Sequence, residues 1–169
     1  STGVPVGLGS YSQWFDRLQS KISESIMSIN AIKGIEFSNA FENSSKLGSQ
    51  VHDEIGWDGK KYIRYSNNAG GIEGGMSNGM PIIVRGTMKP IATLLQGMDS
   101  VNLQTGGAER SDYERSDVCA LPAASVVMEN VVGFEVAVAF LHAFGGATME
   151  MVRASHDAYA NAARNIIST

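Results

Sequence analysis

One cysteine, few charged residues and no basic run set the first limits on this chain of 169 residues. The single cysteine, Cys119, has no partner for an internal disulfide and forms no cysteine cluster for a metal. Charged residues make up 18% of the sequence, against about 25% in an average globular protein. The net charge is −4, and without a basic run a nucleic-acid-binding surface is not expected.

The sequence also lacks an uncharged apolar run of the roughly 18 residues that a membrane-spanning helix needs. The segment 118–149 is strongly apolar, but Glu129, Glu135 and His142 interrupt it. Charges at a helix centre are costly in lipid, so we expect a buried helix of a soluble, cytoplasmic protein. The start, Ser1 to Pro5, resembles neither a signal nor a transit peptide, and the missing initial methionine indicates processing or truncation.

Glycine, in contrast, is abundant, with 19 of 169 residues (about 11%) against about 7% on average. Much glycine and little charge indicate a surface covered by another domain, a ligand or another subunit. The length suffices for one domain with a core, and we find no internal repeat and no linker. Residues 1–169 are therefore predicted to form a single domain.

The first predicted element is a helix over residues 10–28. Trp14, Leu18, Ile22 and Ile26 recur every four residues and form one apolar stripe. A capping box from Ser10 to Gln13 would begin this helix.

Alternating apolar residues then predict strands around 35–37, 62–65 and 81–88, with a mobile polar loop at 43–49. A second helix follows Leu121, with Pro122 in its first turn and Gly145 at its end. It is apolar nearly all round, so it should be central and buried. A third helix is expected over 147–167, with Val152 and His156 on its apolar face. The predicted class is α+β, an antiparallel β-sheet packed with helices.

A glycine-rich segment, 70–79, holds five glycines and leads into an apolar run. Such a cluster indicates unusual dihedral angles or a backbone pressed close to a ligand. No lysine follows as in a phosphate-binding Walker loop, and the glycine spacing does not fit a dinucleotide fingerprint. From the residues alone, a ligand-facing loop and a plain turn between strands both remain open.

Four polar side chains could carry chemistry. Lys89 lies before Pro90, where a strand should end, and could meet an anion, while Thr93 could bind a phosphate or a carbonyl. Arg115 could bind a carboxylate or phosphate through two parallel hydrogen bonds, and Asp117 could accept or donate a proton. Alternatively, Lys89 is simply a solvated lysine, and Arg115 and Asp117 form a surface ion pair or a helix cap. His52, His142 and His156 show no metal-ligand spacing, so we interpret them as structural, and Cys119 as a small packed residue.

Taken together, these segments resemble chorismate synthase, in its carboxy-terminal portion. The similarity covers almost the whole chain, in the family's order, through the blocks Gly7–Ser10, Met27–Glu36, Gly48–Gln50, Asp53–Ile55, Gly70–Gly79, Lys89-Pro90 and Arg115–Cys119. Some members carry Arg-His-Asp-Pro-Cys where this chain has Arg-Ser-Asp-Val-Cys. The difference leaves Arg115 and Asp117 in place.

The resemblance implies a fold that is part of the family's β-α-β sandwich and an enzyme, a phosphate-eliminating carbon–oxygen lyase. The family converts 5-enolpyruvylshikimate 3-phosphate to chorismate and requires reduced FMN, so the flavin supplies the difficult chemistry and the protein binds and orients. By resemblance, Arg115 and Asp117 are the catalytic residues. The flavin site would comprise Asn30, Ala31, Gly74, Gly75, Lys89, Pro90, Ile91, Ala92, Thr93 and Arg115.

The resemblance also implies further parts. Family members carry two important histidines and several arginines in a longer amino-terminal part, and they are usually homotetramers. A substrate with a phosphate and two carboxylates needs several cations, more than Lys89 and Arg115 provide. We therefore expect a carboxy-terminal fragment that holds part of the active site and is inactive alone. A non-catalytic oligomerisation module and a generic anion-binding domain are the alternatives.

Overall fold

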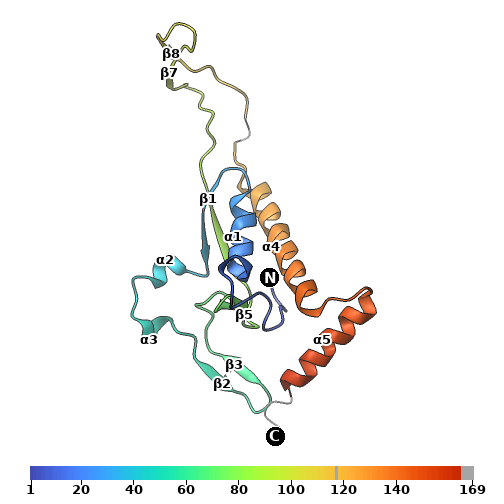
Figure 1. Ribbon diagram of the computed structural model, residues 1–169. Helices are drawn as coiled ribbons and strands as arrows, with labels where there is room; N and C mark the ends of the chain where they lie inside the picture. The colour runs from blue at the N-terminus through green and yellow to red at the C-terminus, as the bar shows by residue number, and fades with distance from the viewer. Residues whose placement is uncertain (117, 165–169) are drawn as a thin grey trace.

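The computed structural model describes residues 1–116 and 118–164 of the chain. Helical elements and one strand come first, the strands β2 to β8 follow in succession, and two long helices end the described chain (Figure 1). The helical elements are η1 (Trp14–Asp16), α1 (Leu18–Met27), α2 (Ala40–Asn43), α3 (Gly48–Val51), α4 (Leu121–Phe144) and α5 (Met149–Arg164). The strands are β1 (Ile32–Phe37), β2 (Ile55–Trp57), β3 (Tyr62–Arg64), β4 (Ile72–Glu73), β5 (Met76–Ser77), β6 (Val84–Met88), β7 (Asp99–Val101) and β8 (Ala108–Arg110).

Helix α1 carries the centre of the core. Leu18, Ile22 and Ile26 are fully buried, as their four-residue spacing predicts. The predicted start of this helix at residue 10 is wrong, because Arg17 is extended (ψ 137°) and separates α1 from the short helix η1. The extended Arg17 lets the Leu18 N–H donate to the carbonyl of Gly75 (2.8 Å). Trp14 consequently leaves the apolar stripe and is 72% exposed.

The predicted capping box at Ser10 is also absent from the described structure around η1. The Ser10 hydroxyl accepts instead from the N–H of Ser12 (3.2 Å), within an exposed turn. A capping box needs a helix that begins directly after the capping residue, and here the first helical residue is Trp14.

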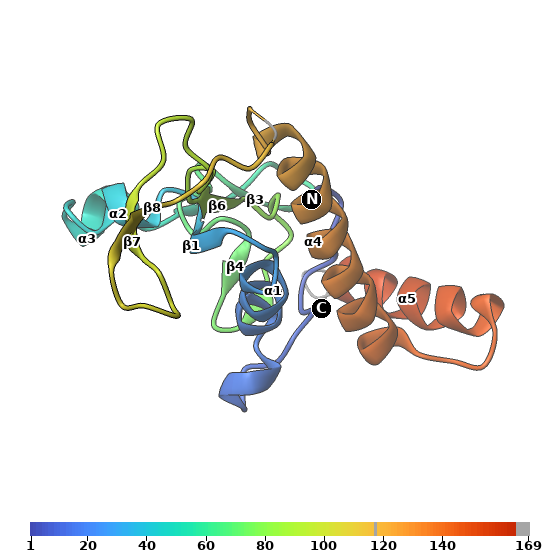
Figure 2. The same cartoon turned by 90° about the horizontal axis from the view of Figure 1, so that it is seen from above.

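The strands pair in four antiparallel two-stranded sheets, β1–β6, β2–β3, β4–β5 and β7–β8. The longest pair, β1–β6, runs from Ile32 opposite Met88 to Phe37 opposite Val84, with an irregularity near Gly34. Side chains of β1 and β6 close the core against α1, and α4 packs beside α1 with Met128 against Gly86 of β6 (Figure 2). Helices packed on antiparallel strands confirm the predicted α+β class.

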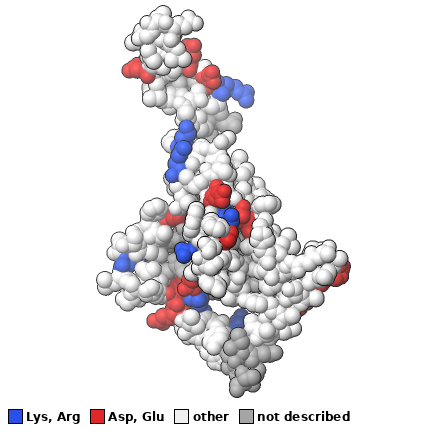
Figure 3. Space-filling view, viewed as in Figure 1, with Lys and Arg blue, Asp and Glu red and all other residues white. Residues whose placement is uncertain are grey.

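Helix α4 is apolar on all sides but is not buried within the described chain. Only Ala124, Val132 and Phe144 are buried, whereas Val126 is 58% and Phe134 66% exposed. The prediction of a central buried helix is therefore wrong for this chain by itself. The helix contacts α1, β6 and α5, but its other apolar side chains have no cover within the described chain, and uncharged surface dominates the view in Figure 3.

By length and composition alone, α4 could also cross a membrane. Its contacts favour a protein environment, because Glu135 is half-buried at mid-helix and accepts a hydrogen bond from the Ser25 hydroxyl of α1. One long apolar helix is weak support for a membrane span, since core helices pass the same test.

Two predicted segments differ in detail. The polar stretch 43–49, expected as a mobile loop, includes the end of α2 and the start of α3, and its Lys46 forms an ion pair with Glu42 of α2 (2.6 Å). The last helix, expected over 147–167, is described from Met149 to Arg164, and residues 165–169 lie outside the described residues. On α5, Val152 is buried and Met149 is exposed.

The α1 core should respond to the loss of a single methyl group. Ile22→Val removes one buried methyl and is expected to lower the free energy of unfolding by about 1 kcal/mol. Glu24→Gln, on the exposed side of the same helix, should change it by less than about 0.5 kcal/mol. Urea unfolding of both variants measures the difference, and equal values would contradict the position of Ile22 in the core.

Candidate functional site

All five glycines of the segment 70–79 adopt positive φ. The values are 66° at Gly70, 85° at Gly71, 58° at Gly74, 94° at Gly75 and 86° at Gly79. Side chains rarely adopt this region of the Ramachandran plot, so the prediction of unusual dihedral angles is confirmed. The backbone also packs closely, because a Cβ on Gly71 would lie 2.6 Å from the carbonyl oxygen of Pro81.

Gly74 and Gly75 form the two-residue turn between β4 and β5. Glu73 pairs with Met76 across it, and positive φ at both central residues is the signature of a type I′ hairpin turn. The two glycines differ in their surroundings. Gly75 is buried against the Ser10 carbonyl and the Arg17 side chain, whereas Gly74 is exposed with nothing within 4 Å of a Cβ position.

This difference predicts that the two alanine variants destabilise the protein by different amounts. Gly75→Ala would overlap the Ser10 carbonyl and should destabilise the protein by more than about 2 kcal/mol. Gly74→Ala meets only the backbone cost of positive φ, about 1 kcal/mol. Thermal unfolding compares them. A Gly74→Ala variant that is the less stable of the two would contradict the described packing.

A second group of predicted residues meets at the other end of α1. Asn30 and Ala31 form the turn from α1 into β1, and the N–H of Lys89 donates to the carbonyl of Ala31 (2.8 Å). Ala31 has a φ of 68°, a strained value for a residue other than glycine, and such strain is enriched at functional sites. The structure thus brings the Asn30-Ala31 turn beside the start of the segment Lys89–Thr93.

The Gly74-Gly75 turn and the Asn30-Ala31 turn are not adjacent in space. Gly75 bonds to Leu18 at the first residue of α1, whereas Ala31 follows the last turn of the same helix. A helix of 10 residues is about 15 Å long. Figure 1 shows β5 at one end of α1 and the start of β1 at the other. A single ligand would have to reach along α1 to contact both groups.

The other predicted residues that the structure describes lie on two long connecting segments, here called legs, that join β6 and α4 to the β7–β8 hairpin at the top of Figure 1. The leg after β6 carries the segment Lys89–Thr93, in which Lys89, Pro90 and Ala92 are exposed and Ile91 and Thr93 are half-buried. The leg before α4 carries Arg115, which is exposed. Asp117, the second predicted catalytic residue, lies outside the described residues.

A cavity of about 580 Å³ opens between β6 and α4. Its lining is mostly apolar and includes Met88, the residue before Lys89, together with Gly86 from β6 and Leu121 and Met128 from α4. Among the described residues, none of those predicted for the flavin or for catalysis lines this cavity. It is therefore a neighbour of the Lys89 segment and not the predicted site itself.

The histidines and the cysteine have no common site. His156 packs against the rings of Phe140 and Phe144, with ring centroids 5.4 and 5.2 Å apart, which suits a structural role. Cys119 is exposed, so the prediction of a packed cysteine is wrong, because the leg that carries it does not enter the core. In the described ranges, no three His, Cys, Asp or Glu side chains gather as a metal site.

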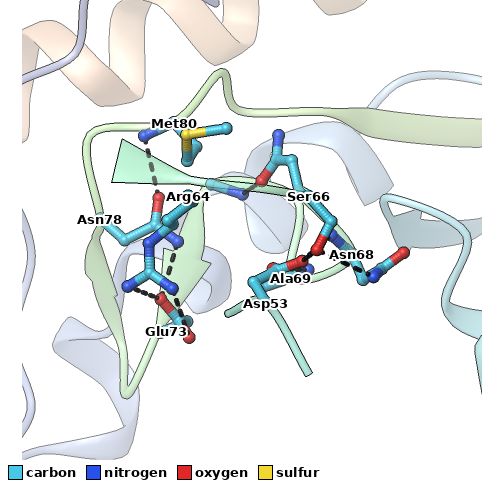
Figure 4. A network of polar contacts seen from close by, with 10 residues as sticks. Asp53, Arg64, Ser66, Asn68, Ala69, Glu73, Asn78 and Met80 are labelled. Carbon is cyan, nitrogen blue, oxygen red and sulfur yellow. Dashed lines mark hydrogen bonds and ion pairs between the residues drawn. The ribbon is translucent and has the colours of Figure 1, made fainter. Parts of the chain in front are cut away.

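Sequence reasoning assigned no role to Asp53, which the structure places in a polar network (Figure 4). Its carboxylate accepts from the Ser66 hydroxyl (2.5 Å) and from the N–H groups of Asn68 (2.7 Å) and Ala69 (2.9 Å). Partial burial tends to raise the pKa of Asp53, but these hydrogen bonds and nearby Arg64 outweigh it and lower the pKa. The one signal in the sequence was the position of Asp53 within a block of the family resemblance.

Comparisons with known proteins identify the family. The family model described as chorismate synthase matches residues 1–141. The chain belongs to the chorismate synthase family. It is 54% identical over 157 residues to the chorismate synthase of Syntrophotalea carbinolica, covering 93% of this chain and 41% of that protein. It is 55% identical to the chorismate synthase of Enterococcus faecalis, over 89% of this chain and 39% of that protein.

A solved structure agrees with this assignment. A crystal structure of chorismate synthase superposes with a TM-score of 0.80 at 43% identity, over 98% of this chain and 42% of that one. The fold described above is therefore the fold of part of a chorismate synthase. The chain spans about two-fifths of the length of these relatives.

Proposed function

We propose that the protein containing this chain is a chorismate synthase that eliminates phosphate from 5-enolpyruvylshikimate 3-phosphate in a reaction dependent on reduced FMN. The family match supports the reaction. The contact between Ala31 and Lys89 supports a flavin site, because it joins two separate segments that the resemblance assigns to the flavin. This contact carries the proposal, since it is a property of the fold and not of either segment alone.

The residues at this end of α1 fit FMN chemically. Lys89 offers an exposed ammonium for a phosphate, Thr93 a hydroxyl, and the Asn30-Ala31 turn offers backbone groups beside them. Bound reduced FMN would supply the electron-rich ring that the elimination requires. The chain itself would bind the flavin, orient it and, through Asp117, move a proton near the substrate. Arg115 would hold one of the anionic groups of the substrate.

This chain would not complete the site alone. The substrate carries a phosphate and two carboxylates, and each buried charge needs a cationic partner. Lys89 and Arg115 are too few, so we propose that further cations come from the rest of a protein of the relatives' length. In that protein the exposed apolar faces of α4 would be covered. A cytoplasmic homotetramer is part of the same proposal.

The exposed surface of α4 favours one alternative function. A helix with Leu121, Val126 and Phe134 all more than half exposed could serve mainly to assemble subunits, as a non-catalytic module. Flavin binding distinguishes the enzyme from the assembly module, because a module that only assembles subunits needs no flavin site.

Flavin titration of the full-length protein tests the proposal. Quenching of FMN fluorescence should report saturable binding, and Lys89→Gln should weaken that binding about tenfold by removing one charged partner. Lys33→Gln is the matched control, since Lys33 is an exposed lysine of β1 outside the proposed site. Saturable binding that is insensitive to Lys89→Gln would place the flavin elsewhere. A lack of binding would favour the assembly module.

A further inference from the structure

Asp53 lies just before β2, at the base of the β2–β3 hairpin. The groups that donate hydrogen bonds to its carboxylate belong to another segment. Ser66, Asn68 and Ala69 follow the hairpin and lead directly into the glycine-rich loop 70–79 (Figure 4). Both oxygens are used, Oδ1 by Ser66 and Asn68 and Oδ2 by Ala69. Asp53 therefore fixes the backbone where the loop begins.

The side chain of Asn67 connects the two ends of the loop. The Asn67 side chain donates from Nδ2 to the carbonyl of Pro81 (2.8 Å) and accepts at Oδ1 from the N–H of Gly71 (2.9 Å). It thus joins the first residues of the loop to the residues that follow it. Asn67 lies between Ser66 and Asn68, so the Asp53 contacts on either side determine where its amide points.

A second carboxylate holds the tip of the loop against the same hairpin. Arg64, the last residue of β3, forms an ion pair with Oε2 of Glu73 (2.6 Å), and the Asn78 side chain donates to the same oxygen (2.8 Å). Glu73 immediately precedes Gly74, the exposed glycine of the turn. The hairpin therefore holds the loop at its entry through Asp53 and beside its tip through Arg64.

The hairpin contributes little to the core. Ile55 and Tyr62 are 62% and 64% exposed, and β2 and β3 pair only with each other. A two-stranded hairpin with exposed apolar residues has little stability of its own. Its polar contacts with the glycine-rich loop are consequently the feature that gives it a defined place.

We propose that Asp53 is a positioning residue that sets the conformation of the loop 70–79 and thereby the affinity for FMN. The inference rests on the proposed function and adds that FMN reaches along α1 to Gly74 and Gly75, which the resemblance assigns to the flavin site. Gly74 offers an open backbone for a ligand, and a glycine turn offers a defined surface only while its ends are held. Asp53 holds residues 66–69, the segment that leads into the loop and its Gly74-Gly75 turn.

An amide cannot replace this carboxylate. In Asp53→Asn one oxygen becomes an NH₂ group, which donates. In either orientation of the amide, that group faces a backbone N–H, because Oδ1 receives Asn68 and Oδ2 receives Ala69. A donor opposite a donor leaves both unpaired, so the variant should release the start of the loop.

The matched control is at the far end of the same hairpin. Asp58 also accepts two backbone N–H groups with its carboxylate, from Lys60 (2.8 Å) and Lys61 (2.9 Å), which lower the pKa of Asp58. Both of these N–H groups donate to Oδ1 of Asp58, so Asp58→Asn removes a carboxylate charge from the hairpin turn while the amide oxygen can keep both hydrogen bonds, and it does not touch the glycine-rich loop. Ser66→Ala is a milder variant that removes a single donor to Asp53.

The experiment compares these variants in the full-length protein, at a temperature where all are folded. In Asp53→Asn we expect the Kd for FMN to rise about tenfold and amide hydrogen exchange of residues 68–79 to accelerate about tenfold. The kcat at saturating FMN should stay within twofold. Ser66→Ala should shift Kd in the same direction by a smaller factor, and Asp58→Asn should change neither readout.

Each outcome decides a different point. Faster exchange with an unchanged Kd would refute the role of the loop in flavin binding, and unchanged exchange would refute the positioning by Asp53. A lower kcat with an unchanged Kd would make Asp53 part of the chemistry, which also overturns the inference. If the wild-type protein binds no FMN, the proposed function fails, and the flavin part of this inference fails with it. If Asp53→Asn does not fold, Ser66→Ala decides by the same criteria.

Discussion

Replacing Arg115 by alanine in the full-length enzyme is expected to raise the Michaelis constant for 5-enolpyruvylshikimate 3-phosphate by about 10- to 100-fold. A guanidinium binds a carboxylate or phosphate with two parallel hydrogen bonds, and alanine provides neither the bonds nor the charge. Arg115 is exposed on the leg before α4, so its removal should leave the core of α1, β1 and β6 intact. Steady-state kinetics at saturating reduced FMN measure the effect.

Arg153→Ala is the control for this prediction. Arg153 is an exposed arginine of α5 and lies outside the proposed site, so its loss should change the Michaelis constant by less than twofold. An Arg115→Ala enzyme with the wild-type Michaelis constant would contradict the role of Arg115 in substrate binding.

Asp117→Asn is expected to lower kcat by about 10²- to 10⁴-fold, the usual contribution of a positioned acid or base. Asparagine keeps the size of the side chain but cannot take up a proton at neutral pH. The affinity for FMN should therefore change by less than threefold, which separates a proton-transfer role from a binding role. Rapid-mixing measurement of phosphate release, together with flavin titration, gives both numbers.

Asp112→Asn provides the comparison, because Asp112 is an exposed aspartate near Asp117 in sequence. It should retain nearly full turnover. Were Asp117→Asn as active as Asp112→Asn, Asp117 would have no part in the mechanism.

The parts of the fold that depend on local pattern could be predicted from the sequence. The four-residue spacing of Leu18, Ile22 and Ile26 predicts one buried stripe, and the glycine cluster predicts unusual dihedral angles, which the positive φ values confirm. The resemblance of separate blocks gave the family, which the comparisons confirm. Periodicity and glycine conformation are local properties, so the sequence expresses them directly.

Features set by distant contacts could not be predicted. The break of the first helix at Arg17 depends on a hydrogen bond between Leu18 and Gly75, more than fifty residues apart. The apolar composition of α4 indicated burial but not what covers it, and within this chain most of the helix is exposed. The sequence also could not show that Gly75 and Ala31 lie at opposite ends of α1.

The Asp53 network illustrates the same limit in the candidate site. A carboxylate before a strand resembles any surface acid in sequence, and its importance follows only from the three donors that converge on it. Those donors lie 13 to 16 residues away, beyond a hairpin. The predicted residues Asn30, Ala31 and Lys89 are brought together by the β1–β6 pair, which is likewise a contact between distant segments.

Phosphate release by the full-length protein under anaerobic conditions tests the central claim most directly. With 5-enolpyruvylshikimate 3-phosphate and reduced FMN, we predict one phosphate released for each chorismate formed, and none with oxidised FMN or without flavin. Release that proceeds equally well without flavin, or no release when reduced FMN is bound, would contradict the account.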